Sequence, residues 1–127
     1  MELSGASFLP NPRAKVRGSA SFKWIENGAF LVMHQGGEEN PQATWLIGRD
    51  ESTELFRVLY FDARGVSRIY EMSFKSGVWK MWRNETGFYQ RFHGVLATNR
   101  RTITAEWEKS DDGNNWEHDF YIRYRRR

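Results

Sequence analysis

The chain has 127 residues, a formal net charge of +3 and no cysteine. This length fits one domain of ordinary size, and the lack of cysteine excludes disulfides, thiolate metal sites and cysteine nucleophiles. The charge excess comes from the last three residues, Arg125 to Arg127, and a neutral body with a basic tip argues against a nucleic-acid partner.

Residues 1–17 differ from the rest of the chain. They contain two prolines, several small residues and the basic cluster Arg13, Lys15 and Arg17. We expect an N-terminal extension that is flexible, forms a short lid or adds an edge strand, ahead of a domain over residues 18–127. The segment lacks the basic start and apolar core of a signal peptide, and no apolar run approaches the ~20 residues of a membrane helix. A cytoplasmic protein without a membrane partner is the expectation.

From residue 19 onward, short runs rich in β-branched and aromatic residues alternate with turn signals. The Asn27-Gly28 pair, for example, is typical of a tight hairpin turn. No stretch shows a helical period over three turns. The pattern predicts about nine strands, at 19–25, 29–34, 43–48, 54–61, 67–74, 78–83, 88–96, 102–109 and 116–125.

Hairpins that follow one another place neighbours in sequence side by side in space. An open meander of this many strands would expose long edges to aggregation, and closure into a barrel removes them. The predicted fold is therefore all-β, a closed antiparallel up-and-down barrel of about nine to ten strands.

Four segments carry a family resemblance that spans Ser19 to Tyr124. They read FKWIENGAFLV, YFDARGVSRIYEMS, GFYQRFHG and EKSDDGNNWEHDFYIRY. The chain resembles a family of small bacterial proteins placed among the lipocalin-like (calycin) barrels. The resemblance implies a lipocalin-like barrel that carries a small hydrophobic ligand, and it implies no known reaction.

Two better-understood barrel families offer partial matches. Nitrobindin-like haem barrels open with GxWxGxGxG, which is absent here, and place an iron-ligating histidine near the C-terminus, which His118 resembles. Fatty-acid-binding proteins end with an Arg-x-Tyr pair that grips a carboxylate. That pair is missing from the final Tyr121 to Arg125, so neither function transfers intact.

The last strand has one largely apolar face. Strict alternation places Trp116, His118 and Phe120 on the same face as Ile122 and Tyr124, and we expect this face to point into the barrel. His118 and the Tyr124 hydroxyl would then lie among aromatic groups. The imidazole is interpreted either as a structural residue with a hydrogen-bond partner, as a ligand contact, or as a haem ligand.

A second polar insertion lies in the run Phe88 to Leu96. If its phenylalanine face is inward, Gln90 is a buried amide that needs partners, from a cross-strand network or from a ligand. Arg91 would then lie outside in a cross-strand ion pair. Arg68 is expected at the surface beside its turn.

The aromatic content, six Trp, five Tyr and nine Phe, favours a core or a ligand cavity rather than base stacking, since Trp107 and Trp116 have acidic neighbours. The function predicted first is non-catalytic binding of a small apolar molecule. An isomerase or hydrolase with His118 as general base, and haem binding through His118, are the alternatives, and a homodimer is compatible with all three. No other cofactor and no metal are expected. The predicted ligand residues are His118, Gln90, Tyr124, Phe22, Trp24, Phe92, Trp107, Phe120, Trp79 and Trp82.

Overall fold

The computed structural model describes residues 1–6, 11, 13, 15–37 and 40–126. Within this part of the chain, every regular element except the short 3-10 turn η1 (Glu26–Gly28) is a strand. None of its helical residues forms a segment long and apolar enough to cross a bilayer. The prediction of an all-β, antiparallel chain is confirmed.

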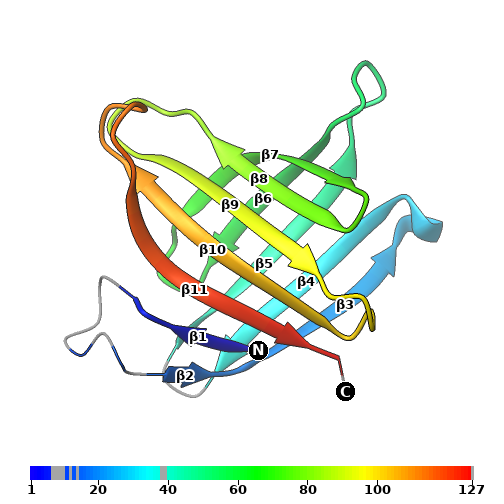
Figure 1. Ribbon diagram of the computed structural model, residues 1–127. Coiled ribbons are helices and arrows are strands. Elements are labelled where there is room, and N and C mark those ends of the chain that lie inside the picture. The colour runs from blue at the N-terminus through cyan, green and yellow to red at the C-terminus, as the bar shows by residue number, and fades with distance from the viewer. Residues whose placement is uncertain (7–10, 12, 14, 38–39, 127) are drawn as a thin grey trace. The chain divides into compact units, whose positions relative to one another are not determined.

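The chain divides into two compact units. The first combines residues 1–17 with residues 74–127, and its strands lie in the hydrogen-bonded order β2-β1-β11-β10-β9-β8. Figure 1 shows the first strand, β1, beside the last, β11. The bounds of these strands are β1 Glu2–Ser4, β2 Lys15–Arg17, β8 Val78–Arg83, β9 Tyr89–Leu96, β10 Thr102–Ser110 and β11 Glu117–Arg125.

The second unit, residues 18–73, is a meander in which each strand pairs with the next along the chain. Its order is β7-β6-β5-β4-β3, so β3 lies at one end. The bounds are β3 Ser19–Ile25, β4 Phe30–Gly37, β5 Asn40–Arg49, β6 Phe56–Asp62 and β7 Ser67–Lys75, the last two residues of which belong to the first unit.

All nine predicted strands are present, with ends shifted by a few residues. Two short strands add to them, because the N-terminal segment pairs with β11 through β1 and then folds back as β2. Of the three alternatives given for residues 1–17 (a flexible segment, a lid or an added edge strand), these strands correspond to the third. For residues 7–10, 12 and 14 the expected extension lies outside the described residues.

The predicted hairpin at Asn27-Gly28 joins β3 to β4. Glu26, Asn27 and Gly28 have φ angles of 50°, 55° and 86°, and the Ala29 N–H donates to the Glu26 carbonyl over 3.1 Å. Asparagine and glycine adopt this left-handed region at low cost, which explains their presence here.

Buried aromatic rings organise the second unit. The Trp45 ring lies 4.6 Å from that of Tyr60 and 5.6 Å from that of Tyr70, between ring centroids. The expectation that Arg68 is exposed is wrong: it is partly buried opposite Tyr60, with its guanidinium carbon 5.9 Å from the centre of that ring. An arginine held over an aromatic face gains from the ring quadrupole.

Asp62 closes the turn between β6 and β7. Its buried carboxylate accepts hydrogen bonds from the Tyr60 hydroxyl at 2.6 Å, the Arg64 guanidinium at 2.6 Å and the Arg64 backbone N–H at 2.9 Å. The Arg64 side chain, followed by the Tyr60 hydroxyl, holds the pKa of this carboxyl well below its usual range, although burial acts the other way. Burial, and then the hydrogen bond to Asp62, raises the pKa of Tyr60 to about 12.

Asp62→Asn tests the importance of this turn. Because the folded pKa of Asp62 is lower than its unfolded value near 4, the carboxylate stabilises the fold above pH ~4 and loses this effect as the pH falls. We expect the variant to lose about 1–3 kcal/mol of unfolding free energy at pH 7 and to show a weaker change between pH 7 and pH 3, measured by urea denaturation.

Asp111→Asn, which removes an exposed carboxylate, is the matched control and should leave both quantities close to wild type. An Asp62→Asn protein with the stability and pH dependence of the control would contradict the assignment.

Candidate functional site

One side of strands β8 to β11 carries a continuous row of aromatic rings. The Trp79 ring centroid lies 4.7 Å from that of Phe92 and 5.9 Å from that of Tyr124. Phe92 lies 5.1 Å from Trp107, which lies 6.3 Å from Phe120. We call this side the aromatic face; all five rings come from the first unit.

Cross-strand register places these rings together. Met81, Phe92, Trp107 and Phe120 stand opposite one another on consecutive strands, and so do Trp79, Gly94, Ala105 and Ile122. Because side chains alternate along each strand, both rows project from the same side of the sheet. Two rows of apolar and aromatic groups thus form a largely buried apolar layer on this side of the sheet.

Gly94 leaves room for the Phe92 ring. A Cβ atom built at residue 94 would lie 3.1 Å from Phe92 Cε1, 3.2 Å from Ile103 Cγ2 and 3.3 Å from Ala105 Cβ. The ring therefore leans along the strand over the glycine. Even an alanine at position 94 would require the Phe92 ring, Ile103 or Ala105 to shift by a few tenths of an ångström.

Trp79 carries a buried donor without an acceptor. The residue is 4% exposed, and its indole Nε1 has no hydrogen-bond partner among the described residues. An unsatisfied buried N–H typically costs about 1–3 kcal/mol, and such a group in a folded protein calls for an explanation.

Two of the three other polar residues predicted for the site, Gln90 and Tyr124, also belong to this face. Gln90 is 6% exposed and stands two residues before Phe92, in register with Arg83 and Lys109. Burial raises the pKa of the Tyr124 phenol above its usual range. The aromatic face thus ends on one side in a buried amide flanked by two basic residues, and it includes a phenol that stays protonated at neutral pH.

His118 lies on the opposite side of the sheet, and the prediction that it shares a face with Phe120 is wrong. A β-bulge shifts the register: Trp107 pairs with Phe120, but the next residue, Glu108, pairs with His118. The extra residue, Asp119, reverses the alternation along β11. We call this opposite side the charged face.

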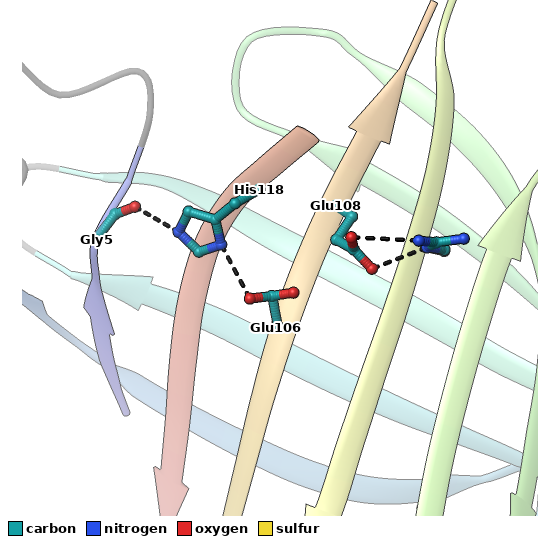
Figure 2. A network of polar contacts seen from close by, with 5 residues as sticks. Gly5, Glu106, Glu108 and His118 are labelled. Atoms are coloured by element: carbon teal, nitrogen blue, oxygen red, sulfur yellow. Dashed lines mark hydrogen bonds and ion pairs between the residues drawn. The ribbon is translucent and has the colours of Figure 1, made fainter. Parts of the chain in front are cut away.

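Figure 2 shows the contacts of His118 on the charged face. Its Nδ1 lies 3.1 Å from Glu106 Oε2, its Nε2 lies 2.7 Å from the Gly5 carbonyl oxygen, and its ring stacks on that of Tyr121 with centroids 4.3 Å apart. Both ring nitrogens therefore lie within hydrogen-bond distance of an oxygen that can accept.

This geometry does not fit haem ligation through His118. An iron ligand needs a free imidazole nitrogen, and each nitrogen here lies within hydrogen-bond distance of an oxygen. Nor does His118 approach the aromatic face, where a bound apolar substrate would lie. The arrangement instead links the N-terminal segment to β10 and β11.

Arg91 also lies on the charged face, as predicted. Its guanidinium forms a two-pronged ion pair with Glu108, at 2.8 and 3.2 Å, and lies 4.0 Å from the centre of the Trp116 ring. Trp116 is therefore on this side too, contrary to its predicted inward position, and the same bulge separates it from Phe120. Among the residues that the structure describes, no group of three or more His, Asp or Glu side chains could hold a metal ion.

Three more predicted residues are Trp82, Phe22 and Trp24. Trp82 alternates with Met81 and stands opposite Arg91, which places it on the charged face. Phe22 and Trp24 belong to β3 in the second unit and are 52% and 65% exposed. Six of the ten predicted ligand residues thus come together: Gln90, Tyr124, Phe92, Trp107, Phe120 and Trp79.

No protein-family model matches the chain, and no curated protein matches it in sequence. Any function must therefore be argued from the residues themselves.

The link between His118 and the N-terminal segment yields a prediction. His118→Ala removes the contacts to Gly5 and Glu106, so we expect backbone amides of β1 to exchange with solvent about tenfold faster, because β1 has only three residues and Gly5 follows it directly. Amides of β9, which lies two strands from β11 and its His118, should keep their protection.

Hydrogen exchange followed by NMR measures the exchange rates of the β1 and β9 amides. His93→Ala, which truncates an exposed histidine on β9, is the control. Unchanged exchange of β1 in the His118→Ala protein would contradict a linking role.

Proposed function

We propose that the protein binds a small hydrophobic molecule against the aromatic face of β8 to β11 without catalysing a reaction. The observation that carries this proposal is the buried indole N–H of Trp79, without an acceptor in the described chain, in the middle of a wall of aromatic rings. A buried N–H without an acceptor destabilises a packed core, whereas an acceptor on a bound ligand would satisfy it.

We further propose that the strands close into an up-and-down barrel of the lipocalin-like kind. Two observations support closure. Within each unit, strands adjacent in the sheet pair antiparallel, and most are neighbours in sequence. In addition, Phe22 and Trp24 expose large rings on the end strand β3, and pairing of that strand would cover apolar surface that is costly to leave in water.

His118, the candidate general base, points away from the aromatic face, toward Glu106 and the Gly5 carbonyl. We therefore propose binding rather than catalysis. The alternative enzyme, with His118 as general base, would need a substrate on the charged face.

Titration with N-phenyl-1-naphthylamine, a neutral dye that fluoresces in apolar surroundings, tests the proposal. We expect saturable binding of one dye per chain. Phe120→Ala removes a partly exposed ring from the wall and should weaken binding by about 1–2 kcal/mol, roughly tenfold.

Val95→Ala is the matched control, since Val95 is 47% exposed and projects from the other side of β9. It should bind the dye like the wild type. Absence of saturable binding, or an equal loss in both variants, would overturn the proposal.

A further inference from the structure

We infer that the ligand is a neutral aromatic compound with a carbonyl oxygen, and that this oxygen accepts a hydrogen bond from Trp79 Nε1. The inference rests on the proposed function and specifies its ligand. It follows from three properties of the surroundings of Trp79: the direction of the missing hydrogen bond, the uncharged side chains in the adjacent rows of β9 to β11, and the arrangement of the rings.

The direction of the hydrogen bond is set by the indole. An indole nitrogen donates a hydrogen bond and accepts none. The group that satisfies Trp79 must therefore be an acceptor, which excludes pure hydrocarbons and favours a carbonyl oxygen.

The charge of the ligand follows from the neighbouring rows. The residues in register with Trp79 are Gly94, Ala105 and Ile122, and the row on one side contains Met81, Phe92, Trp107 and Phe120. The row on the other side contains Leu96, Ile103 and Tyr124. None of these side chains is charged, and the basic residues of this face, Arg83 and Lys109, stand one row beyond Met81 and Trp107. A carboxylate or phosphate at Trp79 would lose its hydration without a cation in the adjacent rows. A neutral acceptor is favoured.

The shape of the ligand follows from the rings. The rings nearest Trp79, those of Phe92 and Tyr124, have centroids 4.7 and 5.9 Å away and are tilted to it by 64° and 40°. The Phe92 ring lies over Gly94, beside Ala105. A flat aromatic body packs well against such a set of rings.

A competing explanation is a weak N–H···π contact with the Phe92 ring, which is nearly edge-on to Trp79. If this contact satisfies the N–H, a ligand with an acceptor gains nothing at Trp79. The experiment below distinguishes the N–H···π contact from a hydrogen bond to a ligand carbonyl.

The test is a cycle of two probes and two proteins. The probes are 2-acetylnaphthalene and 2-isopropenylnaphthalene, which have the same shape but carry C=O and C=CH2 respectively. The proteins are the wild type and Trp79→Phe, which keeps an aromatic ring and removes the N–H. Dissociation constants come from quenching of the remaining tryptophan fluorescence.

The preference is the dissociation constant of the hydrocarbon divided by that of the ketone. We expect this ratio to fall about tenfold in Trp79→Phe, because a hydrogen bond to a buried donor is lost for the ketone only. The ratio cancels the different solubilities of the probes and the loss of ring area. Trp82→Phe, the same substitution on the charged face, should keep the wild-type ratio.

An unchanged ratio in Trp79→Phe would overturn this inference while leaving the proposed function intact. Tighter binding of 2-naphthoate than of the ketone would also overturn it, since that anion has the same rings. If neither naphthalene probe binds saturably, the proposed function itself fails.

A second measurement uses the wild-type protein alone and covers the case in which Trp79→Phe does not fold. The Trp79 indole N–H resonance should move downfield on addition of 2-acetylnaphthalene and much less with 2-isopropenylnaphthalene. Equal shifts with both probes would contradict the hydrogen bond.

Discussion

Side-chain alternation along antiparallel strands, interrupted once by a bulge, decides which residues can meet in the first unit. Strands β8, β9 and β10 keep their register over their whole paired length, so Trp79, Phe92 and Trp107 project from one side. The bulge between Trp107 and Glu108 changes the alternation only in β11. As a result, β11 contributes Phe120 and Tyr124 to the aromatic face and His118 to the charged face.

The two faces have different roles in the fold. On the charged face, Glu106 and Glu108 bind His118 and Arg91, and the Gly5 carbonyl fastens the N-terminal segment to the last strand. On the aromatic face, burial of Phe92 alone contributes about 1.5–3 kcal/mol, and most of the surface is apolar. Polar bonds therefore hold the edge of the sheet, while the aromatic face is left for packing and, in our proposal, for a ligand.

Much of the fold could be predicted from the sequence, because period-two alternation and turn residues are local signals. Every run proposed as a strand is one, and Asn27-Gly28 does form the hairpin turn. Alternation also predicted that Gln90 would be buried and that Arg91 would form an external ion pair. These predictions needed only the spacing of residues within a single strand.

The failures have a common physical origin: they depend on partners distant in sequence. One extra residue at Asp119 turns His118 and Trp116 away from Phe120, and the strand sequence alone carries no sign of this bulge. Arg68 lies inward, where its guanidinium makes a cation–π contact with the ring of Tyr60 on the neighbouring strand. The unsatisfied N–H of Trp79, likewise, becomes evident only once its surroundings are known.

The central claim is that small apolar molecules bind on the aromatic face and not on the charged face. An isotope-filtered NOE experiment on labelled protein with unlabelled N-phenyl-1-naphthylamine tests it most directly. We predict NOEs from the dye to the rings of Phe92, Trp107 and Phe120. NOEs confined to Val95 and Tyr121, on the other side of the same sheet, would contradict the account.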